Sequence, residues 1–136
     1  TAGAAVAMCF EIPNLLLVEE DELLADITSF RLELLGFEVA VQRTAEEALA
    51  YVHETKPDLI ILDLYLPGLD GVEFINRLKM DESAASIPTL VFSVDSDLNV
   101  VTRAHAAGAD DYLVVPYDAA VLQDKLENLL RQGAST

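Results

Sequence analysis

The stretch DLIILDLYLPGLDG, residues 58–71, decides how this chain folds. Its first half is apolar on both faces, which is typical of a central strand in a parallel sheet that helices cover on both sides. The apolar run closes on a carboxylate, Asp63, and the Pro-Gly and Asp-Gly pairs that follow predict a turn. The stretch therefore predicts a buried strand that presents an acid at one edge of a sheet.

The composition favours one soluble domain. The 136 residues are 52% hydrophobic, but no apolar block approaches the roughly 18 residues that a membrane helix needs. Acidic residues number 24 against 8 basic ones, and the net charge of −16 argues against direct nucleic-acid binding because phosphate would be repelled. The single cysteine, Cys9, fits a reducing cytoplasm. We therefore expect a cytoplasmic domain that binds neither nucleic acid nor membranes, and that suits metal cations or a partner with a basic face.

Strand-like and helix-like blocks take turns between residues 14 and 131. The strand-like blocks cover residues 15–18, 37–41, 58–64, 87–93 and 111–115. The helix-like blocks cover residues 21–35, 44–54, 71–80, 97–107 and a last segment from Asp118. This alternation predicts an α/β fold with a parallel sheet covered on both faces. Right-handed crossovers then favour a flavodoxin-like (βα)5 doubly wound sheet with strand order 2-1-3-4-5.

The predicted helices carry their own boundary signals. Gly36 stands where a C-terminal cap belongs, Thr44 and Glu47 have the spacing of a capping box, and Pro57 stops the second helix. Apolar residues at helical spacing predict the first helix: Leu23, Leu24, Ile27, Phe30 and Leu34. The last helix is predicted to bury Leu122, Leu126, Leu129 and Leu130.

A second stretch, LLLVEED (residues 15–21), also ends a predicted strand in acids. In a sheet of this order, ligands bind outside the carboxyl ends of the strands, near the switch point between the first and third strands. Those ends are Glu19, Glu20 and Asp63. Without a cation, carboxylates clustered there should raise at least one pKa, because ionising all of them costs repulsion. The residues favour a metal or phosphoryl site; the alternative is that Asp63 is only a polar strand end that caps a turn.

Four stretches together resemble the receiver domain of bacterial two-component response regulators, of the chemotaxis-regulator kind. They are LLLVEED, PDLIILDLYLPGLDGVEFI, IPTLVFS and YLVVPYD. The resemblance covers about residues 14–131. Residues 1–13 are then expected to form a flexible tail or an appended leader, and residues 132–136 a C-terminal tail. The resemblance implies a phosphorelay signalling protein in the cytoplasm rather than an enzyme.

The resemblance also implies a chemistry for the acids. Asp63 would accept a phosphoryl group from a sensor histidine kinase or phosphotransfer protein. Mg²⁺ would be needed because carboxylate and phosphate are both negative. The implied metal ligands are the side chains of Glu19, Glu20 and Asp63 and the backbone carbonyl of Tyr65.

Further residues are implied in phosphoryl binding and readout. Ser93 would contact a phosphoryl oxygen, and Ser93 with Tyr112 would form the switch. The signal would leave through the face made by the helix over 97–107, the strand over 111–115 and the last helix. The partner there would be a downstream output domain or protein, and a homodimer is compatible with the family.

Three positions depart from the family pattern. Val115, before Pro116, replaces the lysine that normally pairs with the phosphoryl group; Glu20 replaces an aspartate; and Val94 replaces a small residue. These departures predict atypical or weakened phosphorylation. The alternative they leave open is a pseudo-receiver that acts as a phosphorylation-independent interaction or dimerisation module. An enzyme on the same fold is disfavoured, because no glycine-rich phosphate loop or nucleophile–base pair is visible.

Overall fold

The computed structural model describes residues 12–64, 70–94 and 97–134. Five parallel strands form one sheet in the order β2-β1-β3-β4-β5, as predicted. The strands are β1 (Asn14–Val18), β2 (Glu38–Gln42), β3 (Leu59–Asp63), β4 (Thr89–Ser93) and β5 (Asp111–Val114). The helices are α2 (Glu22–Leu34), α3 (Ala45–Thr55), α4 (Gly71–Met80), α5 (Leu98–Ala107) and α6 (Ala119–Ala134). The predicted flavodoxin-like α/β architecture is therefore confirmed.

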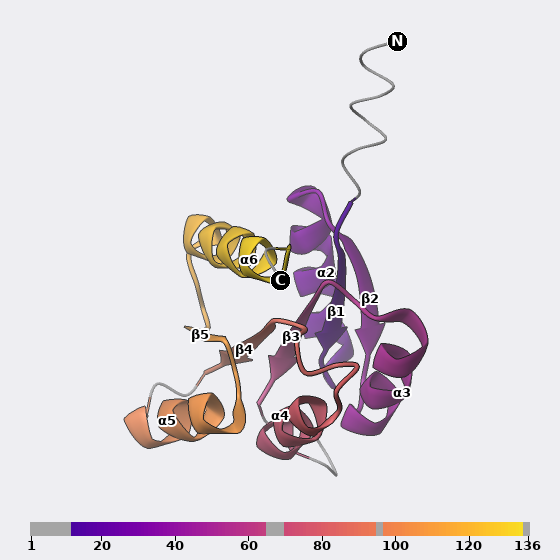
Figure 1. Ribbon diagram of the computed structural model, residues 1–136. Coiled ribbons are helices and arrows are strands. Elements are labelled where there is room, and N and C mark those ends of the chain that lie inside the picture. Colours follow the sequence, from indigo (N-terminus) through magenta and orange to yellow (C-terminus); the bar gives the residue numbers. More distant parts are fainter. Residues whose placement is uncertain (1–11, 65–69, 95–96, 135–136) are drawn as a thin grey trace.

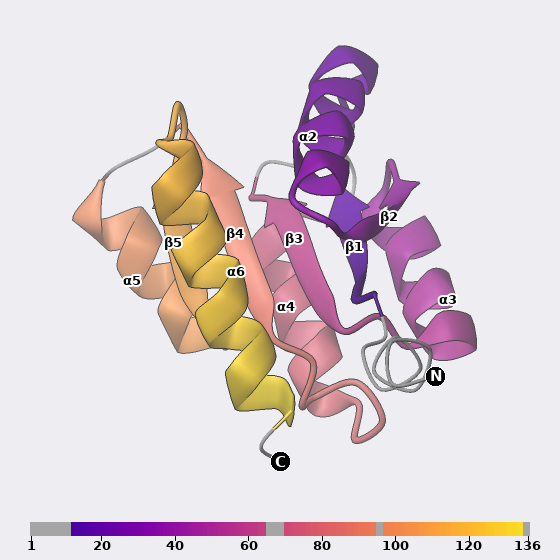
Figure 2. The ribbon, with the colours of Figure 1, turned by 90° about the horizontal axis from the view of Figure 1, so that it is seen from above.

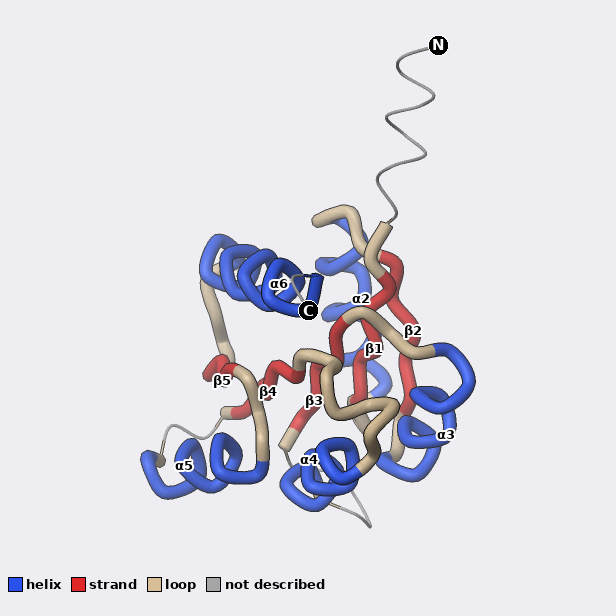
Figure 3. Tube along the Cα trace, viewed as in Figure 1, coloured by secondary structure: helices blue, strands red, loops and turns tan. Residues whose placement is uncertain are grey.

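The sheet lies between two layers of helices. Figure 1 shows α2 and α6 on one face and α3, α4 and α5 on the other, and Figure 3 shows the strands in red as the central layer. Alternate strand residues enter two separate core clusters: Leu16, Ile60 and Val91 pack toward α3, α4 and α5, and Leu15, Ile61 and Phe92 pack toward α2 and α6. Because both faces of the central strands are buried, these strands are apolar throughout.

The strand register brings the carboxyl ends of three strands to one edge of the sheet. Val18 pairs with Leu62, which sets the residue after β1 beside the last residue of β3. On the other side of β3, Asp63 pairs with Phe92 of β4. Glu19, Asp63 and Ser93 are therefore delivered to the same edge by the main-chain pairing alone.

Several predicted boundaries are confirmed in detail. The Thr44 hydroxyl accepts the Glu47 N–H at 3.1 Å as the N-cap of α3, and Gly36 has a positive φ of 99° just after α2. Leu122, Leu126 and Leu129 are buried and Leu130 is partly buried. The helix α6 runs to Ala134, three residues beyond residue 131. No helix in the described part of the chain is long and apolar enough to cross a membrane.

Helix α2 exposes most of the apolar residues that predicted it. Asp21 caps the helix, and its carboxylate accepts the Leu24 N–H at 3.0 Å. The fully buried positions of α2 are Ala25 and Leu32. The five residues of the predicting pattern range in exposure from 39% at Ile27 to 70% at Leu34. Figure 2 shows α2 and α6 standing apart over the sheet.

The start of α4 lies directly against the chain that follows Asp63. The Gly71 N–H donates to the Leu64 carbonyl at 2.9 Å, and Asp70 caps the helix by accepting the Glu73 N–H at 2.9 Å. A Cβ atom at Gly71 would lie 2.6 Å from the Leu64 carbonyl oxygen and 2.8 Å from its Cα. Only glycine lets α4 pack this closely, and this packing holds the backbone next to the acid.

Gly71→Ala should therefore lower the free energy of unfolding by about 2–3 kcal/mol, because the clash is with backbone that cannot rotate away. Arg77→Ala is the control, since Arg77 is an exposed residue of α4 with a weak ion pair to Glu73. Urea unfolding followed by circular dichroism measures both variants. Equal stability of the two would contradict the close packing.

Candidate functional site

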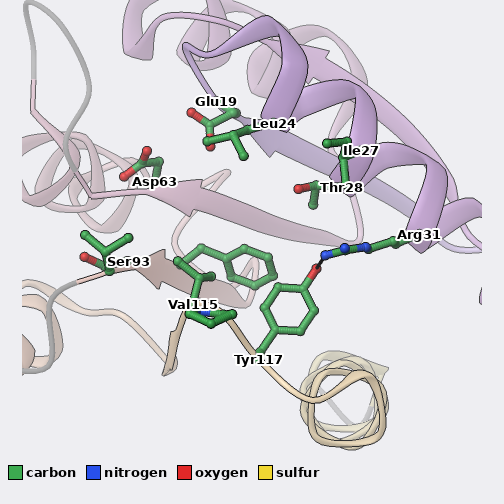
Figure 4. Close-up of a pocket in the computed structure, with 12 residues that line it drawn as sticks. Glu19, Leu24, Ile27, Thr28, Arg31, Asp63, Ser93, Val115 and Tyr117 are labelled. Carbon is green, nitrogen blue, oxygen red and sulfur yellow. Dashed lines mark hydrogen bonds between the residues drawn. The ribbon is translucent and has the colours of Figure 1, made fainter.

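Two carboxylates meet where β1 and β3 end. Glu19 follows β1 directly, and its N–H donates to the Gln42 carbonyl of β2 at 3.1 Å. Asp63 is the last residue of β3. Their side chains share a hydrogen bond, and Figure 4 shows both at the same end of one pocket. The structure thus brings together the two predicted acids whose strands are neighbours in the sheet.

The surroundings of Glu19 raise the pKa of its carboxyl from 4.5 to about 7. Burial of the carboxyl is the largest cause, and the negative charge and hydrogen bond of Asp63 add to it. The Asp21 N–H, which donates to Glu19 Oε2 at 3.2 Å, opposes the rise. One clustered acid thus has a raised pKa, as predicted, but burial contributes more than the repulsion that the sequence suggested, and that repulsion comes from Asp63 and, less strongly, from Asp21.

The other acids of the EED run have different surroundings. The side chain of Glu20 is exposed. The Glu20 carbonyl accepts two hydrogen bonds from the Arg43 guanidinium, at 3.0 and 2.7 Å, which tie this loop to the end of β2. Asp21 is occupied as the cap of α2. Among the residues that the structure describes, no three His, Cys, Asp or Glu side chains form a group that could hold a metal. Tyr65 lies outside the described residues.

The remaining predicted residues fall on both sides of the sheet. Ser93 ends β4, is only 3% exposed and lines the same pocket as Asp63. Val115 also lines it, and its N–H donates to the Ser93 carbonyl at 2.9 Å. Val94 lies on the pocket lining with 75% of its surface exposed. Tyr112 is buried in the opposite core, in the cluster that includes Ala104 of α5.

The pocket as a whole has a volume of about 520 Å³ and continues beyond the acids between mostly apolar walls. Sequence reasoning missed this part, which lies between α2 and the segment after β5. Its far end holds Arg31 and Tyr117, whose hydroxyl accepts a 3.5 Å hydrogen bond from the guanidinium (Figure 4). The one signal in the sequence is the apolar pattern of α2, whose helical spacing predicts a helix and not a cavity.

The donor set of the site fits a hard divalent cation. Mg²⁺ takes oxygen ligands and keeps several waters, so one or two carboxylates are enough. Glu19 and Asp63 are close enough to share a hydrogen bond, and both burial and the charge of Asp63 raise the pKa of Glu19. A divalent cation would supply positive charge and displace the proton.

A parallel sheet in this order, with acids and a serine at its switch point, has the arrangement expected of a receiver domain. Residues 15–127 match the response regulator receiver domain family, and the chain belongs to that family. Receiver domains of this family act in two-component systems, and they typically bind Mg²⁺.

Among curated proteins, the chain is similar to the DNA-binding dual master transcriptional regulator RpaA of Synechocystis. The two are 36% identical over 123 residues, which is 89% of this chain and 50% of that protein. The transcriptional regulatory protein AfsQ1 of Streptomyces coelicolor is 35% identical over 122 residues, covering 90% of this chain and 53% of that protein. The chain thus spans about half the length of these relatives.

Solved structures share the fold. The signal receiver domain of a signal transduction histidine kinase from Syntrophus aciditrophicus has a TM-score of 0.81 and 31% identity, covering 88% of this chain and 90% of that chain. The receiver domain of the sensor histidine kinase PA1611 from Pseudomonas aeruginosa has a TM-score of 0.82 and 24% identity, covering 88% of this chain and 98% of that chain. That protein has a magnesium ion coordinated in its active site cleft.

In the cation-free domain, the free energy of unfolding should fall as the pH rises from about 5 to 8. The folded-state pKa of Glu19 is about 7 against an ordinary 4.5. Its protonated form therefore contributes stability that is complete below the ordinary value and is lost as the pH rises through 7. Glu19 is half-buried, so screening limits the loss to about 1 kcal/mol.

Urea unfolding at stepped pH in the presence of a chelator measures this loss. Glu19→Gln, which cannot ionise, should remove this part of the pH dependence. The same fall in the variant would show that another group is responsible.

Proposed function

We propose that this receiver domain accepts a phosphoryl group on Asp63. The observation that carries the proposal is the position of Asp63, at the end of β3, hydrogen-bonded to Glu19 and lining one pocket with Ser93. An Asp63 carboxylate oxygen would form a bond to phosphorus as the bond from phosphorus to a donor histidine nitrogen breaks. The Ser93 hydroxyl would donate to a phosphoryl oxygen.

Glu19 and Asp63 would hold Mg²⁺, and the Tyr65 carbonyl and Glu20 are further proposed ligands. When bound, the metal supplies positive charge that offsets the repulsion between carboxylate and phosphate. The burial of the Glu19 carboxyl and its hydrogen bond to Asp63 support its place in this set. The exposed side chain of Glu20 gives that residue weaker support.

Readout would pass through α5, β5 and α6. Ser93 and Tyr112 are the proposed switch, and they lie on β4 and β5, which pair through Val91 and Tyr112. Tyr112 is buried against the α5 side of the core, where a change of rotamer would disturb packing. Exposed apolar side chains on this face, Leu98, Val114 and Val121, support its use in contacts.

The proposed partners are a sensor histidine kinase or phosphotransfer protein on the input side and an output domain or protein downstream. The relatives RpaA and AfsQ1 are regulators of transcription, and each is about twice as long as the matched region. With a net charge of −16, this domain itself would not contact nucleic acid. A cytoplasmic location and a homodimer are part of the same proposal. The comparisons give no support to the pseudo-receiver alternative.

Incubation with Mg²⁺ and acetyl phosphate or phosphoramidate should add one phosphoryl group to the chain, on Asp63. Intact-mass spectrometry detects the adduct, and Asp63→Ala should abolish it. Glu19→Ala should slow its formation on the order of tenfold or more, because the metal loses a half-buried carboxylate ligand. Glu20→Ala, which removes the exposed proposed ligand, should have a smaller effect. Absence of any adduct, with no Mg²⁺ binding by titration, would refute the proposal.

Val115→Lys should raise the occupancy or lifetime of the phosphoryl group several-fold. Val115 lines the same pocket as Asp63 and Ser93, so an ammonium there would offset the phosphoryl charge. Val115→Met, which has a long uncharged side chain, separates charge from bulk and should give no such gain. If the lysine variant also gives none, the departures at Glu20 or Val94 explain weak phosphorylation instead.

A further inference from the structure

The whole pocket, acids included, has the size and make-up of a small-molecule site. Its volume of about 520 Å³ falls within the range of roughly 300–1,000 Å³ that is usual for ligand pockets, and its acidic end lies at the switch point of the sheet. Leu24 and Ile27 of α2 form one wall, and Phe92, Val115 and Tyr117 form the opposite wall. Such sites are mostly apolar with a few polar groups that orient the ligand. Here the charged groups lie at the two ends of the pocket, and Thr28 lies on the α2 side between them (Figure 4).

The far end of the cavity is held by contacts of its own. The Arg31 guanidinium donates to the Tyr117 hydroxyl at 3.5 Å and lies 5.8 Å from the centre of its ring. The Tyr117 and Phe92 rings are tilted against each other with centroids 5.3 Å apart. These contacts link the aromatic wall of the pocket to Arg31 of α2 at its far end (Figure 4).

The near end of the cavity is acidic. Glu19 and Asp63 line it together with the buried Ser93. The one basic side chain among the described lining residues is Arg31, which Figure 4 shows at the other end beside Tyr117. A ligand that complements this pattern has a positive charge at one end and an apolar body. An anionic ligand would meet repulsion from both acids, in a chain whose net charge is −16.

We propose that this cavity binds small primary amines with an alkyl or aryl body. The ammonium group would donate hydrogen bonds to the carboxylates of Glu19 and Asp63, and the body would lie between α2 and Tyr117. This binding does not depend on whether Asp63 accepts a phosphoryl group. One consequence does rest on the proposed function: an amine and Mg²⁺ would compete for the same carboxylates, so a bound amine would restrain phosphorylation.

The test uses the full chain and three series of probes with equal carbon numbers: propyl- to hexylamine, the matching alcohols and the matching carboxylic acids. Isothermal titration calorimetry or amide chemical shifts measure binding. Affinity should rise about fourfold with each added methylene, as expected for burial in an apolar cavity. At each length the amine should bind most tightly and the carboxylic acid least. Amines that bind no more tightly than the alcohols would overturn the proposal.

Variants locate the site. Ile27→Trp should fill the cavity and lower hexylamine affinity at least tenfold. Leu23→Trp is its match one turn earlier on α2, at an exposed residue outside the lining, and should change nothing. Asp63→Asn should weaken the amine and leave the alcohol unaffected. Unchanged hexylamine binding in both Ile27→Trp and Asp63→Asn would place the amine elsewhere and overturn the proposal.

Hexylamine should also lower the apparent Mg²⁺ affinity several-fold. Undiminished Mg²⁺ binding at saturating amine would overturn the shared site. If the chain fails to take up a phosphoryl group but still ranks the amines above the alcohols, the phosphoacceptor function fails and the amine site stands.

Discussion

The structure depends on the parallel pairing of β1 with β3, which sets Val18 beside Leu62 and so places Glu19 against Asp63. Main-chain hydrogen bonds hold the two strands in this register, and full burial of their side chains prevents a slip. The backbone therefore keeps the two carboxylates close together, and burial and the neighbouring Asp63 raise the pKa of Glu19 to about 7. Two carboxylates held this close repel each other, and binding of a metal ion, a proton or another cation relieves that repulsion.

The residues around the pair keep its geometry. The Arg43 guanidinium donates to the Glu20 carbonyl, and the Asp21 carboxylate caps α2. The charged side chains of Arg43 and Asp21 therefore bind the backbone rather than a ligand. Gly71 lets α4 close on the Leu64 carbonyl. In the sequence these three acids look like one metal-binding cluster, but in the structure each has a different role. Glu19 faces Asp63, the Glu20 carbonyl anchors a loop, and Asp21 caps a helix.

The pocket joins the acid pair to an apolar cavity, and this changes the meaning of Val115. In the sequence, Val115 is the place where a lysine is missing. In the structure it is part of a wall shared with Phe92 and Tyr117. The uncharged wall leaves the acids without a basic neighbour on that side and keeps the space beside them apolar. The same residue therefore bears on phosphoryl binding and on the class of molecule that the cavity accepts.

The sequence by itself determined the order of the elements, the topology and the edge at which the acids lie. The spacing of apolar residues, the helix caps and the turn residues are signals that act over a few neighbouring residues, so the sequence shows them directly. A doubly wound sheet then has few possible arrangements. The bounds of α4 were predicted to the residue. Only the tertiary structure decided which acid faces Asp63 and which side of α2 is buried. Helical spacing predicted α2 correctly, yet Ala25 and Leu32 face the sheet and Leu24 and Ile27 line a cavity. The physical reason is that a helix rotates and leans to fit its neighbours, and local spacing carries no information about where those neighbours lie.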